Sequence, residues 1–239
     1  MLDKHYDFNV IILTYNNIIN TKKCLSSLYS HTSDFGLVII DNGSDGEVVD
    51  FLKGVEKEHN NVIVKYNDSN TGVIRGRNQG YDTTLTSMMG SYYTIFLDSD
   101  QFVSKGWIDS YIEMMKRGYD IVGVEAWKMR DDFYPYGKLN KHYDGVIFNY
   151  VGCGGMMLRS FIIGHIGLFD DRFSPMFYED PDLCFRAHKH GYKIGWNHSN
   201  KVIHAPHKLL GNSKRKAWFG ASWKKFQDKW DSSDIPILG

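Results

Sequence analysis

Short apolar runs, each ending in a polar cluster, recur along the first half of the chain. They occupy residues 10–13, 37–40, 62–66 and 93–97, and the first three are rich in valine and isoleucine. Helix-forming segments separate them, so strand and helix alternate. This alternation is typical of a parallel α/β sheet, in which ligands bind beyond the carboxyl ends of the strands. The polar clusters are therefore expected to meet at one edge of the sheet.

Composition limits the classes of protein to consider. The 239 residues, 42% of them apolar, can bury a full core as one domain or as one domain with a tail. The 28 basic residues balance 28 acidic ones, so the whole chain lacks the charge excess of a nucleic-acid or membrane binder. Cys24, Cys153 and Cys184 match neither a disulfide framework nor a CxxC metal site. No apolar stretch approaches the length of a membrane span, so we expect a cytoplasmic protein, at most peripheral at a membrane.

A pair of carboxylates follows the apolar run at residues 93–97. Asp98 and Asp100, separated by Ser99, can point together into a cleft. Oxygen ligands of this kind suit Mg²⁺ or Mn²⁺. The alternative is a simple strand-end turn, because aspartate and serine are favoured in turns.

Two histidines follow the strand-like residues 201–203. His204 or His207 adds a metal ligand only if it reaches Asp100. Imidazole completes the coordination of manganese more readily than that of magnesium. A lone histidine is usually structural, which is the alternative to a metal role here, and His207 competes with His204 for the metal.

Polar residues at two other strand ends suit a nucleotide. Asp41 can accept hydrogen bonds from a base or ribose, or can cap the helix that follows it. Residues 70–80 combine glycines, which permit close backbone approach, with Arg75 and Arg77, whose guanidinium groups suit phosphate oxygens. This segment matches neither a Walker A loop nor a GxGxxG fingerprint.

Three carboxylates crowd into four residues at Glu179, Asp180 and Asp182, around Pro181. Such crowding persists where a cation, a proton or an arginine compensates it, so this is a candidate general-base site. The alternative is an acidic first turn of a helix, with proline near its start. Both descriptions can hold together.

The order of these motifs resembles the family 2 glycosyltransferases, which are inverting enzymes with the GT-A fold. The match runs from about residue 10 to His204 and rests on these motifs: Thr14-Tyr15-Asn16, Asp41-Asn42-Gly43-Ser44, Asn70-Thr71-Gly72, Arg77-Asn78-Gln79-Gly80, Asp98-Ser99-Asp100, Gly152-Cys153-Gly154-Gly155, Gly167-Leu168-Phe169-Asp170 and Glu179-Asp180-Pro181-Asp182. The resemblance implies a Rossmann-like mixed sheet with helices on both faces. Residues 1–207 would form the catalytic domain, and residues 208–239 a helical extension packed on it or flanking it.

The resemblance also implies roles for individual residues. Nucleotide-sugar binding would fall to residues at the strand ends: Thr14, Tyr15, Asn16, Asp41, Asn70, Gly72, Arg77, Asp98 and Ser99. Asp41 would read the nucleobase and Asp98 would contact the ribose. Asp100 would hold Mn²⁺ or Mg²⁺ together with His204. The donor would be a nucleotide-diphosphate sugar, with a UDP-sugar favoured.

The catalytic base, by the same resemblance, maps onto Asp180, with Glu179 binding the acceptor or orienting its partner. The acceptor side would include Gly154, Gly155 and Asp182. In an inverting transfer one base and one stabilised leaving group suffice, because the acceptor hydroxyl attacks from the face opposite the diphosphate.

A basic and aromatic segment closes the chain. Phe219, Trp223, Phe226 and Trp230 follow helical spacing, which predicts a helix packing its aromatic face on the domain. The basic residues between them, among them those at 214–216, also suit an anionic lipid, a phosphate-rich glycan or nucleic acid.

Several functions remain open at this stage. The acceptor is a hydroxyl-bearing glycan, lipid-linked molecule or nucleic acid, and a DNA-modifying enzyme acting on hydroxylated bases would use the basic segment. The alternatives from other classes are a non-catalytic sugar- or nucleotide-binding module and a nucleotidyltransferase. The last would release pyrophosphate in place of a nucleoside diphosphate.

Overall fold

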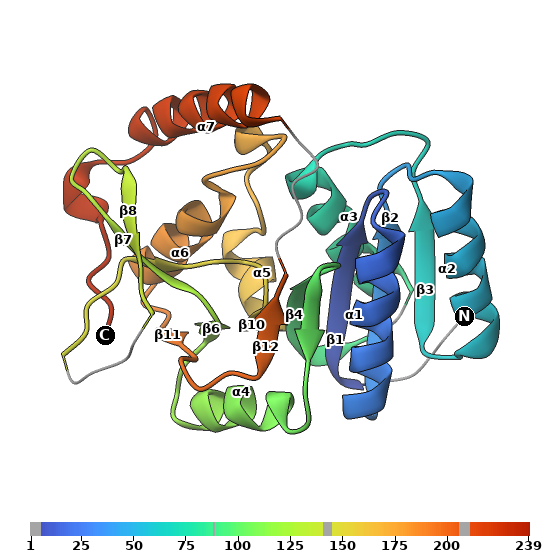
Figure 1. The fold of residues 1–239 in the computed structure, drawn as a ribbon. Helices are drawn as coiled ribbons and strands as arrows, with labels where there is room; N and C mark the ends of the chain where they lie inside the picture. Colours follow the sequence, from blue (N-terminus) through green and yellow to red (C-terminus); the bar gives the residue numbers. More distant parts are fainter. Residues whose placement is uncertain (1–5, 88, 141–144, 206–210) are drawn as a thin grey trace.

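A mixed seven-stranded sheet lies at the centre of the fold (Figure 1). The computed structural model describes residues 6–87, 89–140, 145–205 and 211–239. The strand order is β11-β6-β10-β4-β1-β2-β3. The strands are β1 (Tyr6–Thr14), β2 (Phe35–Asp41), β3 (Val62–Tyr66), β4 (Ser91–Asp98), β6 (Ile121–Gly123), β10 (Met156–Arg159) and β11 (Ile194–Trp196).

The predicted alternation of strand and helix is confirmed in the first half of the chain. Strand β1 pairs in parallel with both β2 and β4, and β2 pairs in parallel with β3. The register places Thr14 beside Asp41 and Leu13 beside Asp98, so these carboxyl ends meet at one edge as expected. Strand β10 runs antiparallel to β4 and β6, which makes the sheet mixed.

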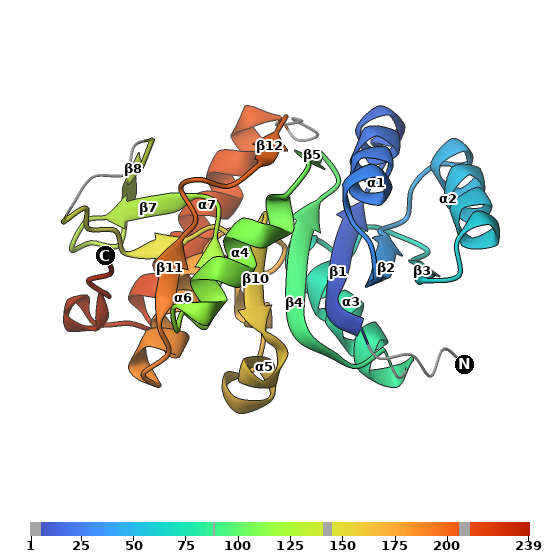
Figure 2. The same cartoon turned by 90° about the horizontal axis from the view of Figure 1, so that it is seen from below.

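Helices cover both faces of the sheet, as predicted (Figure 2). Helices α1 (Ile18–His31), α2 (Gly46–Glu58) and α4 (Trp107–Lys116) pack on one face, and α3 (Val73–Thr86), α5 (Ser160–Ile166) and α6 (Glu179–Lys189) pack on the other. Alternate residues of β1 belong to the two cores: Val10 lies in the core that contains Trp107, and Ile11 lies in the core that contains Ile74. None of the described helices is long and apolar enough to cross a bilayer.

Two small sheets lie beside the main one. Strand β5 (Gln101–Val103) pairs with β12 (Val202–His204), and this antiparallel pairing sets His204 opposite Gln101. The second small sheet has the order β8-β7-β9, formed by β8 (Pro135–Lys138), β7 (Ala126–Met129) and β9 (Tyr150–Val151). The first of these pairings returns a late segment of the chain to the acidic pair after β4.

The C-terminal segment packs on the half of the molecule that contains α6 (Figure 1). It comprises α7 (Asn212–Gln227) and the 3₁₀ helix η2 (Ser232–Asp234); another 3₁₀ helix, η1 (Asp171–Phe173), lies earlier in the chain. Phe226 is fully buried, with its ring centroid 5.1 Å from those of Tyr178 and Phe185. The aromatic stripe therefore packs inward, although Trp230 lies beyond the end of the helix. The predicted domain boundary at residue 207 falls outside the described residues and stays a prediction.

Candidate active site

A cavity of about 1020 Å³ lies where β1 and β4 end. Its walls come from segments far apart in the sequence, and they include Thr14 at the end of β1, Asp98 at the end of β4, Gly72 before α3 and Asp180 at the start of α6. The cavity thus lies at the sheet edge that the sequence predicted, and its volume is that of a small-molecule site.

The acidic pair and one histidine form a cluster in this cavity. Asp98, Asp100 and His204 each offer a ligand atom within 4.8 Å of the others. The Nε2 atom of His204 lies 3.4 Å from Oδ1 of Asp100. The pairing of β5 with β12 brings the histidine there. His207, the alternative ligand, lies outside the described residues.

The other nitrogen of the His204 ring faces Glu125. Nδ1 lies 3.4 Å from Oε1 of Glu125, which also accepts a hydrogen bond of 2.5 Å from Lys138. Hydrogen bonds to Asp100 and then to Glu125 raise the pKa of His204 to about 10. Sequence reasoning missed Glu125, although a carboxylate two residues beyond β6 repeats the signal that pointed to Asp98.

Arg77 joins the two acidic parts of the cavity. Its guanidinium lies 2.7 Å from Oδ1 of Asp98, 3.4 Å from Oε1 of Glu179 and 3.9 Å from Oδ1 of Asp180. The residue is only 8% exposed. In this structure the guanidinium faces the three carboxylates and compensates their charge, and its expected role toward phosphate oxygens stays a prediction.

Asp180 is the carboxyl group best suited to accept a proton. Its burial, followed by the negative charge of Glu179, raises its pKa to about 8. Burial also raises the pKa of Glu179, and Arg77 opposes that rise. Among the described residues, neither Oδ1 of Asp180 nor Oε2 of Glu179 has a hydrogen-bond partner. A buried carboxyl that has a raised pKa and belongs to a residue lining the cavity is a candidate general base.

The start of α6 is held in an unusual backbone conformation. Phe177 and Tyr178, which precede the helix, both have positive φ angles, of 77° and 69°. Such angles are rare outside glycine and persist where packing over-determines them. The ring of Tyr178 packs on Phe219 and Phe226 of α7, and its hydroxyl donates to the carbonyl of Phe133. Packing of α7 thus fixes the turn that carries Glu179 and Asp180.

Most of the predicted nucleotide-sugar residues line the cavity: Thr14, Tyr15, Asn70, Gly72, Arg77, Asp98 and Ser99. Asn16 and Asp41 do not. The Asp41 carboxylate is buried and accepts a hydrogen bond from the backbone N–H of Ser44, while the Asn16 side chain accepts one from the N–H of Asp45. Both therefore shape the loop after β2.

Asn42 and Gln101 line the cavity and were not predicted. The Asn42 amide donates to Oδ1 of Asn70 and accepts from the backbone of Thr71, which ties two loops together. Gln101 is fully buried, and its carbonyl oxygen accepts from the N–H of Asp98 at 2.9 Å. The available signals were that Asn42 belongs to a motif already selected and that Gln101 directly follows one.

Gly154 and Gly155 lie under the acidic pair. Gly154 lines the cavity, and a Cβ atom there would overlap the Asp98 carboxylate. Gly155 has a φ of 76°, and its carbonyl accepts a 2.6 Å hydrogen bond from Tyr111. The first glycine thus makes room for Asp98, and the second forms the turn beneath it.

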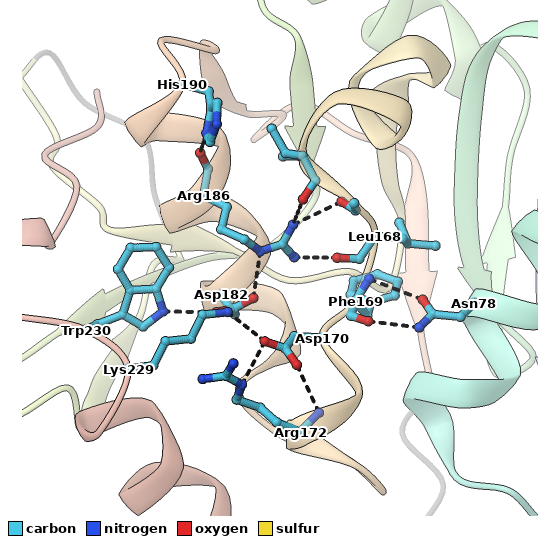
Figure 3. A network of polar contacts seen from close by, with 12 residues as sticks. Asn78, Leu168, Phe169, Asp170, Arg172, Asp182, Arg186, His190, Lys229 and Trp230 are labelled. Carbon is cyan, nitrogen blue, oxygen red and sulfur yellow. Dashed lines mark hydrogen bonds and ion pairs between the residues drawn. The ribbon is translucent and has the colours of Figure 1, made fainter.

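Asp182, expected on the acceptor side, lies elsewhere (Figure 3). Its fully buried carboxylate contacts Nε of Arg186 at 2.8 Å, Nζ of Lys229 at 2.6 Å and Nε1 of Trp230 at 2.9 Å. It does not line the cavity. Residues two positions apart on a helix point to widely different sides, so Asp182 is directed away from Asp180 and anchors the C-terminal segment to α6. Its acceptor-side role stays a prediction.

Comparison with known proteins gives relatives over most of the chain. The sequence model of glycosyl transferase family 2 matches residues 9–187. Glycosyltransferase AglE of Haloferax volcanii is 26% identical over 119 residues, which are 48% of this chain and 38% of that protein. The pre-mycofactocin glycosyltransferase of Mycobacterium tuberculosis is 23% identical over 235 residues, which are 91% of this chain and 47% of that protein. The chain thus spans about half, or less, of the length of these relatives.

Solved structures share the fold. GalNAc-T7, crystallised with UDP, GalNAc and Mn²⁺, superposes with a TM-score of 0.70 at 13% identity, over 85% of this chain and 44% of that one. Staphylococcus aureus TarS 1–349 in complex with UDP-GlcNAc gives a TM-score of 0.60 at 16% identity, over 85% and 60% of the two chains. These likenesses show the GT-A fold. Because the sequence model of glycosyl transferase family 2 matches most of the chain, the protein belongs to this family.

Proposed function

We propose that this protein transfers a sugar from a UDP-sugar to a hydroxyl acceptor with inversion, assisted by Mn²⁺ or Mg²⁺. The observation that carries the proposal is the presence of two groups in one cavity: the cluster of Asp98, Asp100 and His204, and the carboxyl of Asp180 with its raised pKa. Family membership supports sugar transfer. The UDP and Mn²⁺ of the GalNAc-T7 structure and the UDP-GlcNAc of the TarS structure support the donor and the cation.

The cluster fits a divalent cation. Two carboxylates and one imidazole suit manganese better than magnesium, which prefers an all-oxygen shell. Glu125 holds Nδ1 of His204, which leaves Nε2 facing Asp100. A second partner of this kind is usual for a metal-ligating histidine. A cation held there would stabilise the negative charge that develops on the departing diphosphate.

Asp180 would take the proton of the acceptor hydroxyl as that oxygen attacks the anomeric carbon. The new glycosidic bond forms while the bond from the anomeric carbon to the diphosphate breaks, and UDP leaves with the electron pair. The configuration at the anomeric carbon inverts in this single displacement. Arg77 lies between the carboxyl groups of Asp98 and Asp180, and its positive charge compensates their negative charge.

The test combines ligand binding with identification of the leaving group. We expect UDP-sugars to raise the thermal stability of the protein in the presence of Mn²⁺, since ligands that bind the native state stabilise it. Asp100→Ala should weaken this cation-dependent shift. Asp180→Asn should retain it and lose transfer. Full turnover by Asp180→Asn would remove the base assignment.

Three other outcomes would replace the proposal. Release of pyrophosphate in place of UDP would identify a nucleotidyltransferase. Binding of UDP-sugars with no consumption at any cation concentration would favour a non-catalytic binding module. Retention of configuration in the product would exclude the single displacement.

A further inference from the structure

The N-terminal half of α7 forms one wall of the cavity that contains Asp180. Lys214, Arg215, Trp218 and Phe219 line it, and we call these four residues the α7 wall. Sequence patterns alone left this helix with two roles, packing on the domain or binding an anion. The structure divides the roles between the two halves of the helix.

The basic residues later in the segment are engaged by the protein itself. Lys224 pairs with Asp228, Lys225 donates to the backbone carbonyl of Arg172, and Lys229 pairs with Asp170 and with the buried Asp182. The basic residues at 214–216 differ. No carboxylate among the described residues forms an ion pair with any of them.

Two of these basic groups lie over aromatic rings. Nζ of Lys214 is 4.8 Å from the centroid of the Trp218 ring, and Cζ of Arg215 is 5.2 Å from that of Phe177. Cation–π contact places a charge beside an apolar face and leaves its hydrogen-bond donors available. The α7 wall therefore offers cations and ring faces together.

The wall is fixed to the rest of the site. Phe219 packs against Tyr134, Phe177 and Tyr178, with ring centroids between 5.4 and 5.7 Å apart. Tyr178 is the residue that precedes Glu179 at the start of α6. A ligand held by the wall is consequently held in a defined relation to the candidate base.

Charge is segregated within the cavity. The acidic residues come from the strand ends, from the segment after β6 and from α6, where Arg77 of α3 lies among them, whereas Lys214 and Arg215 come from α7. Lys214 and Arg215 therefore attract an anionic group that enters the cavity on the α7 side. A sugar ring would at the same time present its apolar face to Trp218.

We propose that the α7 wall is the acceptor subsite and that the acceptor is a glycan carrying phosphate or carboxylate groups. This rests on the proposed function, because it places the acceptor hydroxyl beside Asp180. The cations lie within a cavity beside the reactive groups, which suits a flexible glycan chain better than a nucleic acid or a lipid surface.

The test measures acceptor binding without donor, so that its failure is distinct from failure of UDP release. Titration calorimetry would compare an oligogalacturonate and a glycerol phosphate oligomer with a neutral maltooligosaccharide of equal length. The two anionic probes separate carboxylate from phosphate recognition. The double variant Lys214→Glu with Arg215→Glu would be compared with Lys216→Glu, which reverses an adjacent exposed charge outside the cavity wall.

We expect at least one anionic probe to bind more tightly than the neutral one, by about tenfold or more, since charge-assisted contacts are the stronger ones. The double variant should remove this preference, and Lys216→Glu should keep it. Trp218→Ala should weaken the binding of every sugar probe. The proposal would be overturned if the intact protein bound neutral and anionic probes equally well. It would also be overturned if Lys216→Glu lost the preference for anionic probes as fully as the double variant. Tighter binding of single-stranded DNA or of anionic vesicles through Lys214 and Arg215 would assign the wall to that partner.

Discussion

The pH dependence of turnover tests the role of Asp180 most directly. A general base acts only when deprotonated, and burial together with Glu179 raises the pKa of this carboxyl to about 8. The value of kcat/KM should therefore rise with pH and reach a plateau above about pH 8. Below that point it should fall about tenfold for each pH unit, so that at about pH 6 it is about a hundredfold below the plateau.

Glu179→Gln provides the internal test. After burial, the negative charge of Glu179 is the largest cause of the raised pKa of Asp180, and glutamine removes that charge while keeping the shape. The pKa of Asp180 should fall, and the midpoint of the acidic limb should move down by roughly one pH unit, since carboxylates that share a site interact by about that much or more. Glu113→Gln, which removes an exposed charge on α4, should leave the midpoint unchanged.

The assay is UDP release at fixed cation concentration and subsaturating donor, followed across about pH 5 to 10, a range that brackets the expected midpoint. The fold of each variant would be checked by circular dichroism at every pH. A midpoint near the ordinary aspartate value would refute the reasoning, because burial would then not govern the base. A midpoint that stays in place in Glu179→Gln would show that another group titrates.

Three further changes have distinct expected results. Arg77→Met should lower the free energy of unfolding by about 3–5 kcal/mol, because the buried carboxyls of Glu179 and Asp180 lose the guanidinium that compensates them, and denaturant titration should show a smaller loss in acid, where the raised pKa values of these two groups leave them neutral. Gly154→Ala should displace the Asp98 carboxylate and weaken UDP binding about tenfold in calorimetry, with a stability change of no more than about 1–3 kcal/mol. Lys229→Met should lower the unfolding free energy by about 1–3 kcal/mol, whereas Lys224→Met, which removes an exposed pair, should change it by less than about 1 kcal/mol.

The fold could be predicted as far as local patterns determine it. The apolar runs at residues 10–13, 37–40, 62–66 and 93–97 became β1 to β4, because β-branched stretches bounded by turn residues are recognisable without knowledge of their partners. The antiparallel insertion of β10 between β4 and β6 was not predictable in this way. It depends on contacts between residues far apart in the sequence, such as Met156 and Phe96.

In the site, residue types were predictable and side-chain directions were not. Asp41 is the last residue of β2 and Asn42 follows it, yet only Asn42 lines the cavity. Successive side chains of an extended segment point to opposite sides. Of two neighbouring residues, one can therefore line the cavity while the other is buried in the protein and supports the loop. On helix α6, Asp180 lines the cavity whereas Asp182 points away from it, and the sequence does not show which of the two does so. His204 could be predicted as a candidate metal ligand only on the condition that it reaches Asp100, because its approach to Asp100 depends on the β5–β12 pairing.

The C-terminal segment is joined physically to the helix that carries the candidate base. The first turn of α6 turns Asp180 toward the cavity and buries Asp182 against Lys229 and Trp230 (Figure 3). Without that segment, the buried carboxylate of Asp182 would keep Arg186 as a partner but lose its two other donors, and the turn before Glu179 would lose its aromatic support. A partly uncompensated buried charge beside a strained turn is unfavourable. We infer that α7 and the residues after it belong to the same cooperative unit as the cavity, even though the composition of the chain changes at this point.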